Sequence, residues 1–171
     1  YMNLPSGIDG GVYDLTQKTV AGLDNPYDKA VAIREFLLAN YSYKLDVGYP
    51  PGRSDFVSHF LLVSKEGYCT YFATSMAVMA RIAGLPARYV EGYLVYPDED
   101  GVTEVTGLDA HAWVEIYFKG AGWVSFDPTP GLDWSQPEGD DMQNADPTPE
   151  PPDDDGAEQP PEDEPTPEPS G

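Results

Sequence analysis

Three residues of this sequence have the types that nucleophilic chemistry by a thiol requires: Cys69, His111 and Asp127. In such chemistry a thiolate attacks a carbonyl carbon, a base within hydrogen-bond reach moves the proton, and a third group orients the base. Cys69 is the only cysteine of the chain, and the two histidines are His59 and His111. The sequence therefore offers one candidate nucleophile and a very short list of partners.

Cys69 falls at a point where a loop turns into a helix. Gly67 precedes it, and large apolar residues then recur at helical spacing over 72–82, until Gly84 ends the segment. The unpaired N–H groups and the dipole at a helix N-terminus stabilise a thiolate. This position predicts a reactive cysteine. The alternative is a small buried hydrophobe, which is the commonest role of a lone cysteine.

His111 and Asp127 lie on two segments that predict an antiparallel hairpin. His111 opens the alternating segment 110–118, and Asp127 closes the segment 123–127. Because both residue numbers are odd, the two side chains share a face of the sheet only if the connecting loop has an odd number of residues or a bulge. Glycines between the strands supply the positive φ that such loops use. The alternative is a His and an Asp that make ordinary capping bonds at strand ends.

The elements ahead of Cys69 read as helices. Asn25 as N-cap and a proline at the first helical position predict a helix over 26–41, and a weaker pattern predicts one over 12–21. A third, short helix over 55–62 carries His59 among apolar neighbours. We expect a packing or surface role for this histidine.

The elements after Cys69 read as strands. Residues 88–96 alternate, 97–101 form a turn, and 102–106 are predicted to return as the hairpin partner, before the second hairpin that carries His111. Helices first and an antiparallel sheet afterwards predict an α+β fold with the sheet packed on the Cys69 helix. The loop 45–54, rich in glycine and proline, is long enough to border a site.

Charge divides the chain into two parts. Residues 133–171 hold fourteen of the thirty Asp and Glu, ten of the eighteen prolines and no Lys or Arg. Such a segment cannot bury enough apolar surface to order itself, so we expect one domain over 1–132 and a disordered acidic, proline-rich linker over 133–171. The net charge of −21 excludes a basic nucleic-acid surface. With no His/Cys cluster at ligand spacing, we expect no metal and no cofactor.

Several ordered motifs resemble the transglutaminase-like core: Gly67–Met76, Gly84–Arg88 followed by Gly92-Tyr93, His111–Glu115, and Trp123–Pro130. The resemblance implies a papain-like cysteine proteinase fold in which Cys69 is the nucleophile, His111 the base and Asp127 the group that orients it. It also implies acyl transfer on a glutamine carboxamide or peptide amide through a thioester. The expected partners are a protein or peptide substrate and an amine acceptor.

The helix from Pro26, the segment 55–62 and the acidic tail are most similar to the extracytoplasmic domain of bacterial membrane-bound transglutaminase-like proteins. This similarity implies a location on the extracellular face of a bacterial membrane, anchored through segments outside this sequence. Animal transglutaminases have glutamine where this chain has Tyr68, and every tryptophan here follows Cys69. Two alternatives therefore stay open: a cysteine peptidase or deamidase that uses water as acceptor, and a noncatalytic extracellular peptide-binding or cell-wall-binding module.

Overall fold

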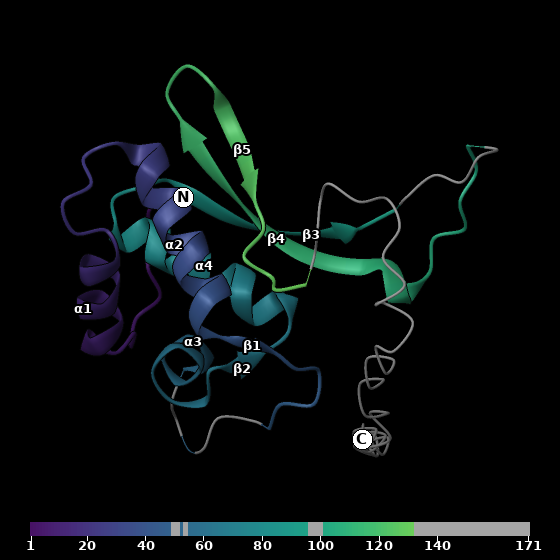
Figure 1. The fold of residues 1–171 in the computed structure, drawn as a ribbon, viewed down its shortest axis with the longest axis horizontal. Coiled ribbons are helices and arrows are strands. Elements are labelled where there is room, and N and C mark those ends of the chain that lie inside the picture. Colours follow the sequence, from purple (N-terminus) through teal and green to yellow (C-terminus); the bar gives the residue numbers. More distant parts are fainter. Residues whose placement is uncertain (49–51, 53–54, 96–100, 132–171) are drawn as a thin grey trace, which may run out of the picture.

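The order of helices before sheet is confirmed in the computed structural model, which describes residues 1–48, 52, 55–95 and 101–131 (Figure 1). The first part of the chain forms α1 (Gly10–Thr19), α2 (Pro26–Asn40), β1 (Ser42–Tyr43), α3 (Phe56–His59), a π-helical turn (Phe60–Ser64), β2 (Glu66–Gly67) and α4 (Cys69–Ile82). The second part forms β3 (Ala87–Tyr93), a 3₁₀ turn (Gly107–Asp109), β4 (Ala110–Phe118) and β5 (Gly122–Phe126).

Side-chain caps fix the starts of the first three helices. Asp9 accepts a hydrogen bond from the Gly11 N–H at 2.7 Å, so α1 begins at Gly10, two residues earlier than expected. Asn25 caps α2 as predicted, and its Oδ1 accepts from the Tyr27 N–H at 2.8 Å. Asp55 caps α3, but the α-helix ends at His59 and continues as the π-helical turn, where the sequence predicted one helix through residue 62.

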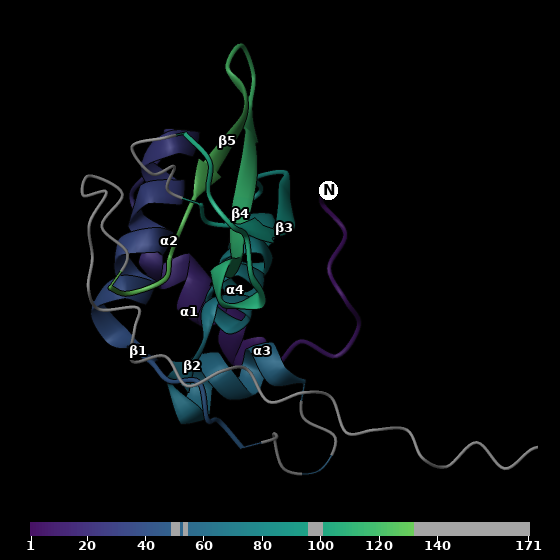
Figure 2. The same cartoon turned by 90° about the vertical axis from the view of Figure 1, so that its right-hand side faces the viewer.

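Helix α4 forms the centre of the core. Its apolar stripe is confirmed, because Phe72, Met76 and Met79 are fully buried. The helix packs on β4 and β3 on one side and on α2 and α1 on the other. Figures 1 and 2 show α4 between the N-terminal helices and the three-stranded sheet. Helix α4, which begins with Cys69, is therefore held by burial of side chains from two layers.

The main sheet has the strand order β3-β4-β5, with both neighbours antiparallel. The predicted return strand at 102–106 is wrong: the structure places no strand there, and β3 pairs directly with β4 over seven residues. The reason is burial. Val114 and Ile116 of β4 are fully buried when β4 takes the central position, whereas Val102 is 75% exposed.

A small second sheet lies at the other end of the molecule from the tip of the β4–β5 hairpin (Figure 2). It consists of β1 and β2, which pair in parallel so that Tyr43 lies opposite Gly67. Backbone bonds from Ser42 N to Lys65 O at 2.9 Å and from Lys44 N to Gly67 O at 2.8 Å hold the pair. This sheet fixes the path of the chain directly before Cys69.

Some expectations fall on residues that the structure does not describe. These are most of the 45–54 loop beyond residue 48, the turn at 97–100 and the whole acidic segment 133–171. The boundary between a domain over 1–132 and a linker therefore stays a prediction. Among the helices in the described ranges, none combines the length and the apolar character needed to cross a bilayer.

Gly67 gives a first testable prediction. A Cβ at this position would lie 2.7 Å from the Tyr71 Cβ and 3.1 Å from a ring carbon of Phe60, so Gly67→Ala must displace packed groups. We expect a loss of about 1–3 kcal/mol in the free energy of unfolding, measured by urea denaturation. The matched control is Gly48→Ala, where a Cβ meets nothing within 4 Å. Equal stability of the two variants would contradict the packing seen at Gly67.

Candidate active site

Cys69 is the first residue of α4, as the sequence predicted. The residue before it, Tyr68, has an extended backbone and makes no side-chain cap, in contrast to the capped starts of α1, α2 and α3. The first N–H groups of a helix have no partner within the helix. The thiol therefore lies where backbone donors and the positive end of the helix dipole act together on it.

The register of the β4–β5 hairpin brings His111 and Asp127 to one face of the sheet. Phe118 pairs with Gly122, so the loop contains three residues, the odd number that this meeting requires. Gly120 and Gly122 have φ of 95° and 86°, which only glycine adopts readily. Asp127 follows the last residue of β5. If the register of β4 and β5 is continued beyond that residue, the position opposite His111 lies two residues after Asp127. His111 and Asp127 are therefore diagonal neighbours on one face of the sheet. The odd-loop expectation is confirmed.

A hydrogen bond and an electrostatic coupling link the three residues. His111 Nε2 lies 2.5 Å from Asp127 Oδ2, and the imidazole and the Cys69 thiol each shift the pKa of the other. His111 is 8% and Asp127 6% exposed, while Cys69 is partly exposed. The thiol is thus partly accessible to solvent, and the His111–Asp127 pair is almost completely buried.

Asp127 is held by two further contacts. Its Oδ1 accepts from the Thr129 N–H at 2.9 Å, and its backbone carbonyl accepts from Arg34 Nε of α2 at 2.8 Å. The first contact is an Asx turn, which the order Asp-Pro-Thr indicates to a reader of the sequence. The second joins residues far apart in the chain, and no local pattern predicts it. Together they fix the carboxylate that binds the imidazole.

Opposing effects set the pKa of the Cys69 thiol. Burial is the largest of them and raises the pKa. The hydrogen bond and positive charge of His111, with backbone hydrogen bonds from Ala112 and Thr70, outweigh it, so the net pKa is lowered. Cys69 therefore forms a thiolate more easily than a free cysteine does, and it depends on His111 for this.

His111 has the complementary shift. Burial alone would lower its pKa, but the hydrogen bonds to Asp127 and Cys69 and the charges of both raise the pKa to about 9. Near neutral pH the imidazole is then protonated. The protonated imidazole lies beside a thiol whose pKa is lowered, so each group favours the charged form of the other.

Two phenols also lie within electrostatic reach of the thiol. Burial and then the charge of Cys69 raise the pKa of Tyr43. Burial, the hydrogen bond to Glu91 and the charge of Cys69 raise the pKa of Tyr89 to about 12. Both phenols keep their protons at neutral pH and can donate hydrogen bonds. Sequence reasoning did not pick out either tyrosine, because each comes from an element distant in the chain from Cys69.

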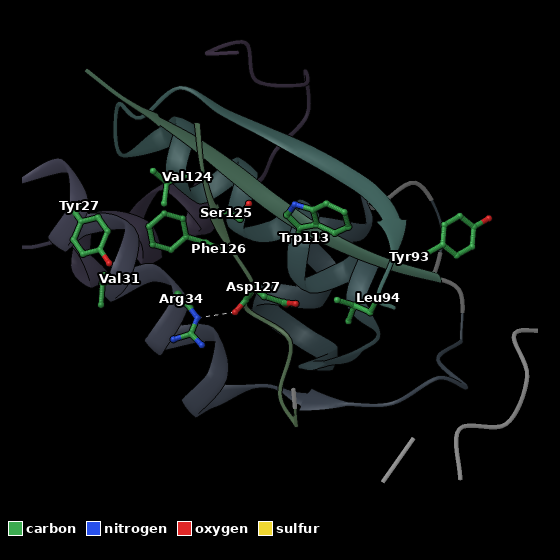
Figure 3. A pocket seen from close by; sticks show the side chains of 10 residues that line it. All are labelled: Tyr27, Val31, Arg34, Tyr93, Leu94, Trp113, Val124, Ser125, Phe126 and Asp127. Atoms are coloured by element: carbon green, nitrogen blue, oxygen red, sulfur yellow. Dashed lines mark hydrogen bonds between the residues drawn. The ribbon is translucent and has the colours of Figure 1, made fainter. Parts of the chain in front are cut away.

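A pocket of about 590 Å³ lies beside the carboxylate end of this chain of residues (Figure 3). Its lining is aromatic with a few polar groups, and includes Tyr27, Arg34, Trp113, Ser125, Phe126 and Asp127. Figure 3 shows Arg34 reaching from α2 to Asp127. The pocket thus lies next to the carboxylate.

His59 does not belong to the site. It is the last residue of α3, is half-buried and makes none of the contacts to Cys69 described above. Within the described part of the chain, no three His, Cys, Asp or Glu side chains are arranged to hold a metal ion. The functional candidates are therefore the three residues that the sequence selected.

The fold and the site define a protein with a papain-like arrangement: a cysteine at the start of a central helix, facing a histidine and an aspartate on an antiparallel sheet. A model of the Transglutaminase-like superfamily matches residues 13–128 of the chain. The chain belongs to this family.

Curated relatives agree with this assignment. The uncharacterized protein YebA of Bacillus subtilis is 39% identical over 140 residues, which cover 77% of this chain and 19% of YebA. A protein-glutamine gamma-glutamyltransferase of Pseudomonas aeruginosa is 36% identical over 108 residues, 58% of this chain and 15% of that protein. The chain thus spans less than a fifth of the length of these relatives.

Solved structures show the same fold. The periplasmic domain of TgpA from Pseudomonas aeruginosa, bound to ethylmercury, superposes with a TM-score of 0.65 at 31% identity, over 74% of this chain and 46% of that one. A Cytophaga hutchinsonii protein, provisionally classed as a cysteine protease, gives 0.54 at 26% identity, over 74% and 40%. The expected papain-like, α+β transglutaminase core is confirmed, as is the similarity to bacterial extracytoplasmic domains.

His111→Gln tests the electrostatic coupling. The imidazole supplies the two largest effects that lower the pKa of Cys69, so we expect this pKa to rise in the variant. The rate of alkylation by iodoacetamide at pH 7 should then fall by about tenfold for each unit that the pKa rises, because the thiolate fraction falls. Cys69 is the only thiol, so the pH profile reports on this residue alone. His59→Gln is the matched control. An unchanged profile in His111→Gln would mean that the helix start alone activates the thiol.

Proposed function

We propose that the chain is a cysteine-dependent acyltransferase domain that acts on a glutamine carboxamide or a peptide amide. The observation that carries the proposal is the buried hydrogen bond between His111 and Asp127, together with Cys69 at the start of α4, where its thiol is electrostatically coupled to the imidazole. Membership of the Transglutaminase-like superfamily supports it. So does the similarity to a relative named as a protein-glutamine gamma-glutamyltransferase.

In the first half of the proposed reaction, the Cys69 thiolate attacks the amide carbonyl carbon. The C=O electron pair moves to oxygen, and the backbone N–H of Cys69 at the helix start donates to the resulting oxyanion. His111 gives its proton to the leaving nitrogen as the C–N bond breaks. Ammonia or an amine departs, and a thioester joins the acyl group to Cys69. Asp127 holds the imidazole in orientation through both proton transfers.

In the second half, an acceptor attacks the thioester carbonyl carbon. Neutral His111 removes a proton from the acceptor, the C–S bond breaks, and the thiolate returns beside the imidazolium. An amine acceptor yields a new amide, and water yields a carboxylic acid. The buried His111–Asp127 pair is suited to both steps, because the imidazole gives a proton in the first half-reaction and takes one in the second while the carboxylate holds its ring in place.

Hydrolysis is the second candidate function. The structural similarity to a protein provisionally classed as a cysteine protease favours it. The two candidates share the acylation half-reaction and the same three residues. They differ only in the acceptor, amine or water, so one experiment separates them.

The cellular setting is part of the proposal. The superposable TgpA domain is periplasmic, and we infer an extracytoplasmic location for this domain as well. Because the chain spans less than a fifth of its curated relatives, anchoring in a membrane would come from segments outside this sequence. Protein or peptide substrates and amine acceptors are then expected outside the cytoplasm.

The test is incubation of the domain with dansyl-cadaverine and a glutamine-bearing protein, scored by mass. Addition of the amine supports transamidation, while a gain of about one mass unit at glutamine or chain scission supports hydrolysis.

Cys69→Ala should reduce every product to background, because no other thiol can form the thioester. Asp127→Asn should keep the fold but lower the rate by orders of magnitude. Undiminished turnover in Cys69→Ala would refute the mechanism.

A further inference from the structure

A carboxylate, that of Glu91, projects from the face of the main sheet on which α4 packs. Glu91 follows Tyr89 by two residues on β3, and alternate residues of a strand project from one face. Tyr89 pairs with Val114, which is fully buried in the core. Glu91 pairs with Ala112, yet its own side chain is exposed. The carboxylate therefore lies on the inner face of the sheet at a point that α4 does not cover.

This point is close to the nucleophile. Burial raises the pKa of the Cys69 thiol, and Ala112, directly opposite Glu91, is among the residues whose hydrogen bonds lower it. Cys69 is also the first residue of α4, so the uncovered part of the sheet face begins where the thiol lies. Glu91 is thus one strand away from a residue that acts on the sulfur.

The phenol of Tyr89 connects this carboxylate to the start of α4. Its hydroxyl donates to Glu91 Oε1 at 2.5 Å, a length typical of a hydrogen bond to an ionised carboxylate. The same hydroxyl lies 3.5 Å from Oγ1 of Thr70, the residue that follows Cys69. After burial and the hydrogen bond to Glu91, the charge of Cys69 also raises the pKa of Tyr89. Glu91 is therefore fixed near the thiol by one of its two oxygens.

No lysine or arginine in the described part of the chain neutralises Glu91. The ion pairs found there are Arg34–Glu35, Lys44–Glu66, Arg88–Glu115 and His111–Asp127. Arg88 is on the same strand, but it is three residues from Glu91 and pairs with Glu115 on the opposite face of the sheet. Glu91 thus offers a fixed, uncompensated negative charge to whatever approaches the thiol from this side.

We propose that Glu91, held by Tyr89, is a specificity-determining residue that favours a positively charged amine as the acceptor. This inference rests on the proposed function, because it concerns the second half-reaction. The carboxylate attracts the ammonium group and raises its concentration beside the thioester. The ammonium releases one proton to water, and the neutral nitrogen bonds to the carbonyl carbon. His111 takes a second proton from that nitrogen, and the C–S bond breaks. Water carries no charge and gains nothing from Glu91, so the carboxylate favours transamidation over hydrolysis.

The first test needs no turnover. Aminoethyl methanethiosulfonate carries an ammonium group, methyl methanethiosulfonate is uncharged, and both form a mixed disulfide with Cys69, the only thiol. The ratio of their rate constants reports the charge beside the sulfur, because a change in the thiol pKa affects both reagents alike. In Glu91→Gln the amide oxygen still accepts from Tyr89, but the charge is lost. We expect the ratio to fall by about fivefold at low salt, the effect of a partly exposed ion pair.

The second test is the choice of acceptor during turnover. Dansyl-cadaverine supplies a cationic amine, whereas hydroxylamine is largely uncharged at neutral pH. With a glutamine-bearing protein as donor, Glu91→Gln should lower the ratio of kcat/KM for dansyl-cadaverine to that for hydroxylamine by about fivefold as well. Because salt screens exposed charges, this ratio should fall with rising salt in the wild type and stay constant in the variant.

Glu115→Gln is the matched control, since it removes the same charge from the opposite face of the same sheet. It should leave both ratios close to the wild-type values. The proposal is overturned if the two variants change the ratios equally, or if Glu91→Gln changes neither ratio. A wild type that forms neither the amide nor the hydroxamate refutes the proposed function. The reagent ratio then still decides whether Glu91 attracts cations to Cys69: a fall in Glu91→Gln alone supports this, and an unchanged ratio overturns it.

Discussion

The buried hydrogen bond between His111 and Asp127 is the interaction on which the site depends. It exists only because a three-residue loop sets the register of β4 and β5, and because the Thr129 N–H and the Arg34 side chain fix the aspartate from two directions. Arg34 belongs to α2, which packs on α4, the helix that carries Cys69. The same packing that forms the core therefore brings the thiol to the imidazole and secures the carboxylate behind it.

Burial and charge act against each other throughout the site. Removal from water makes a lone thiolate and a lone imidazolium both unfavourable. Burial by itself therefore raises the pKa of Cys69 and lowers the pKa of His111. Placed together, with Asp127 next in line, each charge stabilises its neighbour. The partly exposed Cys69 remains reachable, while the two groups that sustain its charge are almost completely covered. Reactivity in this arrangement belongs to the cluster and not to the cysteine alone.

Local patterns in the sequence predicted the parts of the fold that local physics determines. Asn25 as a cap, the buried stripe of α4 and the odd loop before Gly122 all follow from short-range rules. The partner of β3 did not, because Val102 and its neighbours are mostly β-branched, as strand residues often are. Only the burial of Val114 and Ile116 against α4 selects β4 instead. That choice is a tertiary effect with no local signature.

The same division holds for the site. The order Cys69, His111, Asp127 is legible in the sequence, and the Asx turn at Asp127 could have been read there. The bond from Arg34 and the two phenols near the thiol join distant segments, so only the folded chain shows them. Because the charge that activates Cys69 arrives on a different element, the unfolded chain carries an ordinary, weakly reactive thiol. The lowered thiol pKa then requires the contact between β4 and α4, which makes the rate of thiol labelling a direct report of that contact during folding.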